Sequence, residues 1–216
     1  MVLNLKSKKV RQVTDGSTWY SLSGGFDYQW SPDGKWFALE FIAHKHEPYS
    51  DIGLVCADGK SPIINLTNSG YTSGMPRWTM DGNALLFTTE RYGMRNHASW
   101  GSLDDVMMVF LNQDAYDKFR LSKEDYELQK ELEKEQEKAG ETASKDKKKD
   151  KKADAKTDSV KLITVEPDGI EDRIVRLTPN SSRLSSAAIS KDGETLYYLS
   201  TFEGGFDMWK NGLAQA

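Results

Sequence analysis

The sequence predicts an all-β protein: a partial β-propeller of four-stranded antiparallel blades, with a helical and disordered charged insertion. Three observations predict this fold. A hairpin motif built on Asp-Gly occurs three times, short apolar segments recur at fixed places around it, and the spacing from Asp33 to Asp81, between the first two copies, matches one blade. Four-stranded propeller blades repeat every ~40 to 50 residues.

The hairpin motif aligns without gaps in three segments, Gln29–Leu39, Arg77–Phe87 and Ala188–Tyr198. Each copy has an apolar residue, a short polar stretch, Asp-Gly, and then apolar and aromatic residues. Glycine after aspartate supplies the positive φ that a tight turn between two strands requires. We therefore assign the three aspartates to turns and not to catalysis: Asp33, Asp81 and Asp192.

Two further elements flank the hairpins. Short strands that end at a turn precede them: Val10–Thr14, Ile63–Thr67 and Ile174–Thr178. Strands that begin with aspartate follow them: Asp51–Val55, Asp105–Val109 and a shorter copy at Asp207–Trp209. Each unit thus has four short strands, and Val10–Thr14 is predicted to be an outer strand with no room before it for the other three strands of its unit.

An insertion lengthens the second repeat, since Asp192 lies more than twice as far from Asp81 as Asp81 lies from Asp33. Asn112–Arg120 is predicted to be a short helix. Ser122 and Asp125 form a capping box at the start of a second, highly charged helix. Residues 130–157 contain almost nothing apolar, and a lysine and aspartate run spans 145–152, so we expect disorder.

The strand pattern resumes at Val160–Val165, and Asp168-Gly169 is the next turn. The domain division predicted from these patterns is propeller blades over 1–111, the insertion over 112–158, and truncated propeller blades over 159–216. The count is two full blades and most of a third, whereas a closed ring needs at least about four. We expect a fragment of a longer protein; the alternative is a homo-oligomer whose chains complete one ring.

Composition narrows the function classes. Net charge is −4, and the basic residues do not gather on a folded stretch, so we expect no nucleic-acid partner. No apolar run approaches the ~18 residues that span a bilayer. Cys56 is the single cysteine and lies in an apolar run, where we expect a buried, inert thiol.

Two resemblances to known families follow from these residues. Trp30–Lys35, with the sequence Trp-Ser-Pro-Asp-Gly-Lys, resembles the TolB-like propeller repeat. This repeat indicates the fold and not the function. Phe110–Glu124, the charged tract after it and Gly169–Ser182 resemble the propeller region of bacterial tricorn protease homologues. This likeness covers roughly residues 28–212.

The second resemblance implies a parent protein that degrades peptides. In that family N-terminal propellers precede a PDZ-like domain and a C-terminal peptidase domain with a serine nucleophile, related to the C-terminal processing peptidases. The propeller is thought to gate peptides or present them to the catalytic chamber. No residue of this sequence matches the family's catalytic motifs, so we assign no catalytic residue.

Other candidate sites are weak. His44, His46, Glu47 and His97 lack metal-ligand spacing, so we expect no metal. The serine of Ser23–Gly25 is outside a nucleophile elbow, and the chain has no phosphate-cradling glycine loop, so we expect no cofactor. The aromatic residues at repeat positions, among them Trp30, Trp36, Trp78 and Tyr198, are expected to pack blade against blade.

The predicted substrate-binding residues are Arg91, Arg95 and Trp100. They lie in a loop between strands that is longer than its counterpart in the first unit. Long loops on a rigid scaffold often carry binding sites, so we expect this loop to contact peptides.

The leading hypothesis is therefore a non-catalytic propeller segment of a tricorn-like serine peptidase. One alternative is a TolB-like protein-interaction propeller with no peptidase domain, and another is the propeller of a prolyl-oligopeptidase relative. The expected partners are peptide substrates or the remainder of the polypeptide, in the cytoplasm or the periplasm.

Overall fold

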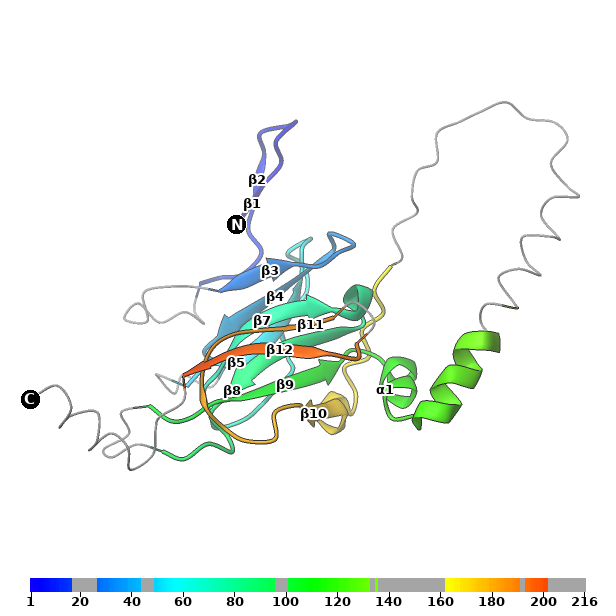
Figure 1. Cartoon of the computed structure of the whole chain (residues 1–216). Coiled ribbons are helices and arrows are strands. Elements are labelled where there is room, and N and C mark those ends of the chain that lie inside the picture. The colour runs from blue at the N-terminus through cyan, green and yellow to red at the C-terminus, as the bar shows by residue number, and fades with distance from the viewer. Residues whose placement is uncertain are drawn as a thin grey trace, which may run out of the picture.

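The computed structural model describes residues 1–16, 27–43, 49–95, 101–132, 135, 162–190 and 193–201. These residues are mostly β-structure in antiparallel sheets with few helices, which confirms the all-β class (Figure 1). Within these ranges the sheets do not close into a ring.

The first sheet contains the four strands predicted for the first unit. They are β3 (Tyr28–Trp30), β4 (Trp36–Phe41), β5 (Asp51–Cys56) and β6 (Ile64–Asn65). Their order in the sheet is β3-β4-β5-β6, and each neighbouring pair is antiparallel. Gly34 supplies the predicted positive φ, 69°, in the turn between β3 and β4.

The second sheet repeats this order, and its fourth strand is far from the other three in the sequence. They are β7 (Ser73–Thr79), β8 (Ala84–Thr89), β9 (Asp105–Phe110) and β10 (Ile174–Arg176). The order is β7-β8-β9-β10. The predicted insertion therefore lies between the third and fourth strands of one sheet, because β10 pairs with β9 across it.

Two smaller sheets complete the β-structure. In the third sheet, β11 (Arg183–Ile189) pairs with β12 (Leu196–Thr201), as the third hairpin motif predicts. At the N-terminus, β1 (Val2–Leu3) pairs with β2 (Val10–Arg11). Of the predicted strand Val10–Thr14, only Val10–Arg11 is a strand, and its partner is β1 in this hairpin. The predicted strand Asp207–Trp209 lies outside the described residues.

The first, second and third sheets stack face to face, and each interface is an apolar cluster. Between the first two sheets, Ala38 and Leu54 pack with Leu85 and Val109. Leu86 and Met108 on the other face of the second sheet contact β11, β12 and α1 (Gln113–Phe119) through apolar residues. Successive side chains of a strand point to opposite faces, so the central strands are apolar throughout and not alternating. Their core residues lie on both faces.

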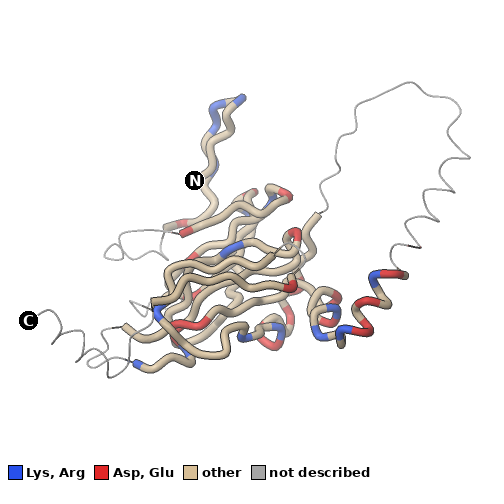
Figure 2. The backbone as a smooth tube through the Cα atoms, viewed as in Figure 1, with Lys and Arg blue, Asp and Glu red and all other residues tan. Residues whose placement is uncertain are grey.

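The insertion begins with the two predicted helical segments. Asn112 caps α1 by accepting a hydrogen bond from the Ala115 N–H at 2.9 Å. Residues 123–132 are also helical, and Ser122 accepts from the Asp125 N–H, which confirms the cap. This second segment is dense in charge and stands away from the sheets (Figure 2). The disorder predicted for 130–157 concerns residues that mostly lie outside the described ones.

The predicted strand at Val160–Val165 is not present in its described part, 162–165. This segment runs without sheet pairing across the ends of the first two sheets. The Ile163 N–H donates to the Asp33 carboxylate at 3.0 Å, and the Glu166 N–H donates to the Leu111 carbonyl. Ile163 and Val165 pack on the cluster between the two sheets. Their apolar character thus reflects burial and not strand pairing. The predicted turn at Asp168-Gly169 is present.

None of the described helices is long and apolar enough to cross a membrane.

Candidate functional site

The predicted binding loop lies at one end of the second sheet, where β8 ends, β9 begins and β10 ends. Two arginines meet one exposed tyrosine there. The guanidinium carbon of Arg91 lies 5.5 Å from the centre of the Tyr92 ring, and that of Arg176 lies 5.3 Å from the same ring. We call Arg91, Tyr92 and Arg176 the loop-end cluster. Cationic groups at this distance are attracted to the ring face.

Asp105 holds Arg176 in this position. Its carboxylate is fully buried and accepts hydrogen bonds from Nε and Nη2 of Arg176 at 3.0 and 2.9 Å. The hydroxyls of Thr178 and Ser181 donate to the same carboxylate at 2.8 and 2.7 Å. Four donors offset the cost of removing the charge from water. Arg176 is therefore presented to solvent by a buried, fully bonded anchor.

Part of this anchor is a structural feature of the repeat. In the first sheet Asp51 occupies the place of Asp105, and it accepts from the Thr67 hydroxyl at 2.6 Å. In both sheets the threonine hydroxyl also accepts from the backbone N–H after the aspartate, that of Ile52 or Val106. The Asp–Thr pair joins the third strand of a sheet to the end of its fourth strand. At the position of Arg176 the first sheet has Asn65, whose side-chain amide donates to Asp51 at 3.1 Å, so the second sheet differs in having a cation there.

Asp104, next to Asp105, is differently placed. Burial, together with the negative charges of Glu90 and Asp105, raises the pKa of Asp104 to about 6. Its backbone pairs with Ser182 in both directions, with N···O distances of 2.8 and 3.0 Å. The carboxylate is thus held close to two other acids by the backbone, and it changes charge near neutral pH.

The rest of the predicted loop folds back on the sheet. The guanidinium carbon of Arg95 lies 5.1 Å from the centre of the Tyr71 ring, on the connection between β6 and β7. Gly93 passes so close to the Leu103 carbonyl that any side chain there would overlap it. Of the three predicted residues, Arg91 lies against the Tyr92 ring and Arg95 against the Tyr71 ring. Trp100 lies outside the described residues.

This arrangement can bind an anionic or aromatic group. Arg91 and Arg95 are exposed, and their guanidinium groups can donate paired hydrogen bonds to a carboxylate. Tyr92 adds an exposed ring against which a flat side chain can pack. Tyr92, Arg176 and the Asp105 anchor are not among the residues predicted from the sequence. The recurrence of Asp and Thr in the repeated elements was the pattern that could have revealed the anchor.

The remaining candidates from the sequence are a histidine group, a serine segment and Cys56. His44, His46, Glu47, His97 and the Ser23–Gly25 segment lie outside the described residues. Among the residues that the structure describes, no group of three or more His, Cys, Asp or Glu could hold a metal ion. Cys56 is only partly buried, because it ends β5, so the prediction of a buried thiol is wrong in degree.

A hollow lies at the opposite end of the second sheet from the loop-end cluster. It encloses about 850 Å³ between the β7–β8 turn, α1, the helical residues 123–132 and the 162–166 segment. Acidic residues dominate its charged lining, with one lysine among them: Asp81, Asp114, Asp117, Glu166 and Lys118. Asn112, a buried polar side chain of this lining, serves as the cap of α1, and the charged side chains of the lining are exposed or half-buried, so the loop-end cluster is the better candidate.

No protein-family model matches the chain, and no curated protein matches it. Among solved structures, the chain is similar to the crystal structure of the tricorn protease, with a TM-score of 0.47 and 9% sequence identity. The similarity covers 86% of this chain and 16% of the tricorn protease chain, so the chain spans about a sixth of that structure's length. A likeness of this size carries no statement about activity.

Proposed function

We propose that the chain is a non-catalytic β-propeller segment of a tricorn-like serine peptidase, which binds peptides and presents them for proteolysis. In this proposal residues 1–111 and 159–216 are propeller blades, and residues 112–158 are an insertion. The resemblance of Phe110–Glu124 and Gly169–Ser182 to bacterial tricorn homologues supports the peptidase context.

One structural observation supports the propeller most directly. Each sheet packs its face on the next sheet along the chain, with equivalent repeat positions on equivalent faces. Trp78 of the second sheet faces the first sheet, and Ile189, at the same repeat position, faces the second sheet. Radial repetition of one sheet in one direction is the construction principle of propellers.

The loop-end cluster, together with Arg95 on the same loop, is the proposed peptide-contacting surface. Arg91, Tyr92 and Arg95 lie on the longer of the two equivalent loops, and Arg176 is anchored beside them by a buried carboxylate. Guanidinium groups recognise carboxylates, and the tyrosine ring recognises flat or apolar side chains. Both features suit peptides with mixed side chains.

Peptide binding tests the proposed surface. Fluorescence anisotropy with a labelled hexapeptide series of acidic, neutral and basic side chains should show saturable binding to the whole chain. The double variant Arg91→Ala/Arg95→Ala should weaken binding of acidic peptides about tenfold or more, because a hydrogen bond to a charged group contributes about 1.5 to 3 kcal/mol.

Arg120→Ala is the matched control. Arg120 also lies over a tyrosine ring, that of Tyr116 at 5.5 Å, but near the other end of the second sheet. Equal losses for the control and the double variant would contradict the proposed surface. Peptidase activity of the longest product encoded by the gene tests the peptidase context, and an inactive product that still binds peptides would favour a TolB-like interaction propeller.

A further inference from the structure

Each sheet has two faces that can be named from the stacking. The forward face points to the next sheet along the chain, and the backward face points to the previous one. Ala38 and Leu86 occupy equivalent repeat positions on forward faces, since Ala38 faces the second sheet and Leu86 faces the third. Phe87 lies on the backward face of the second sheet. At both interfaces, the forward face of one sheet packs on the backward face of the next sheet.

The forward face of the third sheet is exposed. Tyr197 occupies the position of Ala38 and Leu86, and 63% of its surface is accessible; for its neighbour Leu199 the fraction is 66%. With Ser186 and Ala188 they surround a shallow hollow of about 420 Å³. Adjoining exposed apolar side chains of this size mark an interaction surface.

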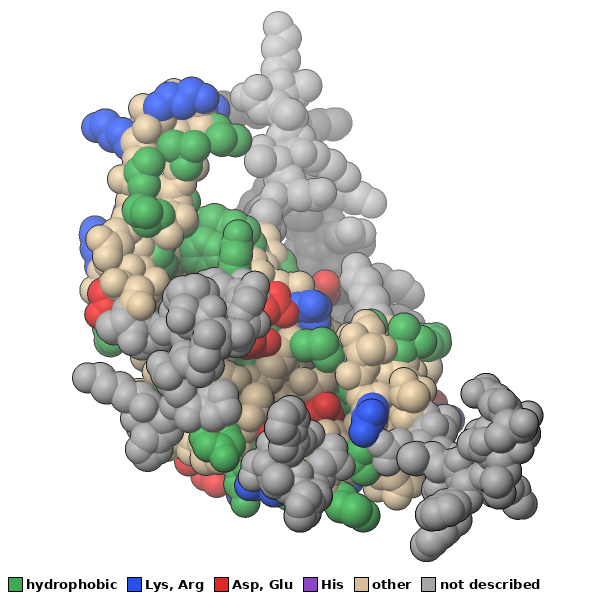
Figure 3. Space-filling model, turned by 90° about the vertical axis from the view of Figure 1, so that its left-hand side faces the viewer, with side chains coloured by type: hydrophobic (Ala, Val, Ile, Leu, Met, Phe, Trp, Pro, Cys, Tyr) green, Lys and Arg blue, Asp and Glu red, His purple; other side chains and the backbone are tan. Residues whose placement is uncertain are grey.

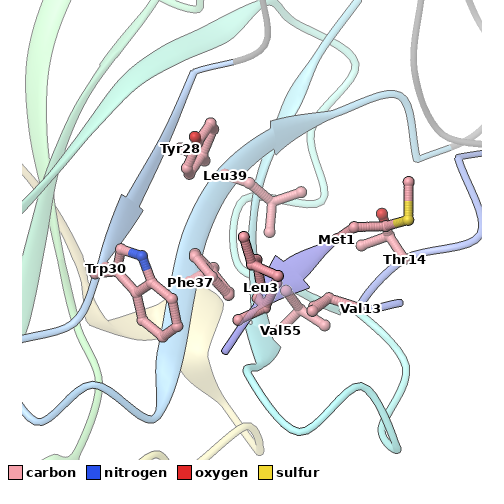
Figure 4. A pocket seen from close by; sticks show the side chains of 10 residues that line it. Met1, Leu3, Val13, Thr14, Tyr28, Trp30, Phe37, Leu39 and Val55 are labelled. Atoms are coloured by element: carbon pink, nitrogen blue, oxygen red, sulfur yellow. The ribbon is translucent and has the colours of Figure 1, made fainter. Parts of the chain in front are cut away.

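The backward face of the first sheet is exposed along β3, while Phe37 and Leu39 on β4 are buried beneath Val2 and Val13 of the N-terminal segment. Tyr28 and Trp30 retain 54% and 46% of their accessible surface and lie beside Phe37, at ring-centre distances of 6.1 and 3.9 Å. A hollow of about 360 Å³ lies between these rings and the N-terminal hairpin (Figure 4). Hydrophobic side chains are visible on the hairpin and directly below it (Figure 3).

We infer that these two faces pack on each other between two copies of the chain, the third sheet of one copy on the first sheet of the other. The molecule already makes this forward-on-backward contact twice. A second copy therefore offers a backward face to the exposed forward face, and a forward face to the exposed backward face. Two copies bring six stacked sheets, three from each, and propellers typically contain four to eight blades. A head-to-tail contact of this kind closes into a ring when made in both directions.

One hydrogen bond specifies the contact further. The Trp78 indole N–H donates to the Gln29 carbonyl at 3.2 Å across the interface between the first two sheets. In the repeat, Trp30 is equivalent to Trp78, and Ala188 is equivalent to Gln29. The Trp30 indole of one copy is therefore expected to donate to the Ala188 carbonyl of the other.

The N-terminal segment fits the same arrangement. Val13 is equivalent in the repeat to Leu66 and Leu177, which pack at the forward interfaces of the first and second sheets. Val13 packs on Phe37, Leu39 and neighbouring residues of the backward face. It thus lies where the outer strand of a preceding sheet belongs. In the pair of copies, that preceding sheet is the partner's third sheet.

Glutamate substitutions on the two faces test the contact. Tyr28→Glu places a charge on the backward face and Leu199→Glu places one on the forward face. Leu128→Glu, at an exposed leucine of the charged helical segment, is the control. Sedimentation equilibrium should give twice the chain mass of 24.4 kDa for the wild type and the control, and the mass of a single chain for each face variant.

Mixing the two face variants distinguishes a head-to-tail contact from a symmetric one. A Tyr28→Glu copy keeps its forward face, and a Leu199→Glu copy keeps its backward face. An equimolar mixture should therefore regain dimer mass through one intact contact. Far-ultraviolet circular dichroism of each variant checks that the fold is kept.

Two results would overturn the inference. A wild type that sediments with the mass of a single chain at all concentrations means that other sheets cover these faces. A mixture of the variants that stays monomeric, or one face variant that remains dimeric, means that the contact is not forward on backward. Peptide binding at the loop-end cluster is measured with different variants, so failure of either proposal is recognised separately.

Discussion

Asp104 and Asp105 are neighbours in the chain, but they lie in different surroundings. Asp105 is fully buried and accepts hydrogen bonds from Arg176, Thr178 and Ser181. Asp104 is partly buried, and Glu90 and Asp105 repel its charge. The two neighbouring carboxylates therefore have opposite effects: Asp105 anchors the structure, whereas Asp104 destabilises the folded state when it is ionised.

Asp104→Asn should therefore stabilise the protein at neutral pH. The pKa of Asp104 is raised to about 6 from 3.8, so the folded state is penalised above about pH 6 and the penalty disappears below about pH 4. The expected gain in the free energy of unfolding at pH 7.5 is about 1 kcal/mol, allowing for screening by solvent. At pH 4 the gain should vanish. Urea denaturation at both pH values measures it.

Glu127→Gln is the control for this experiment, since Glu127 is an exposed acid of the charged helical segment. It removes one negative charge without relieving Asp104 and should change stability little at either pH. A gain for Asp104→Asn that is equal at pH 4 and pH 7.5 would contradict the assigned pKa.

At the scale of elements, two glycine turns that look alike in sequence differ in their surroundings. Gly34 and Gly82 both follow aspartate and have φ of 69° and 91°. No atom lies within 4 Å of a Cβ built on Gly34, whereas a Cβ on Gly82 would overlap the Ile163 side chain. The turn at Gly82 is therefore also the surface on which the 162–166 segment rests.

Gly82→Ala should cost more stability than Gly34→Ala. Gly34→Ala should lower the free energy of unfolding by about 1 kcal/mol, the cost of a left-handed backbone with a side chain. Gly82→Ala should lower it by about 2 to 3 kcal/mol, because Ile163 must also move. Hydrogen exchange at 162–166 should rise in Gly82→Ala and not in Gly34→Ala. Equal costs would show that Ile163 does not pack on this turn.

The elements show which parts of the structure can be predicted from the sequence. Hairpins and outer strands were predicted because turn glycines and apolar runs are local features. The 162–165 segment was wrongly predicted as a strand, since burial of Ile163 and Val165 gives the same apolar pattern as pairing. In the candidate site, loop length pointed to Arg91 and Arg95. Arg176 was missed because it reaches Tyr92 only through the pairing of β10 with β9.

At the scale of the molecule, the insertion interrupts one sheet without disturbing it. The whole insertion separates Phe110 from Ile174, the facing ends of β9 and β10, yet β10 keeps the place that β6 has in the first sheet. The Leu111–Glu166 hydrogen bond and the packing of Ile170 hold the two ends near the core. The sheet thus depends on these ends and not on the charged tract between them.

Replacing residues 128–160 with a short Gly-Ser linker should leave the fold intact. Loop-closure entropy changes by about 0.6 kcal/mol per doubling of loop length, so the free energy of unfolding should change by less than about 1 kcal/mol. Circular dichroism and urea denaturation check both statements. A loss of several kcal/mol would show that the tract packs on the folded part.

The late arrival of β10 also has a consequence during synthesis. Translation adds about 5 to 20 residues per second, so the edge of β9 waits about 3 to 13 seconds for its partner strand. β9 reads Asp-Val-Met-Met-Val-Phe, an apolar and weakly charged segment of the kind that aggregates through an open edge. The highly charged insertion leaves the ribosome next, and its charges resemble the gatekeeper residues that flank such strands. The insertion would then keep a nascent chain soluble until its own sheet is complete.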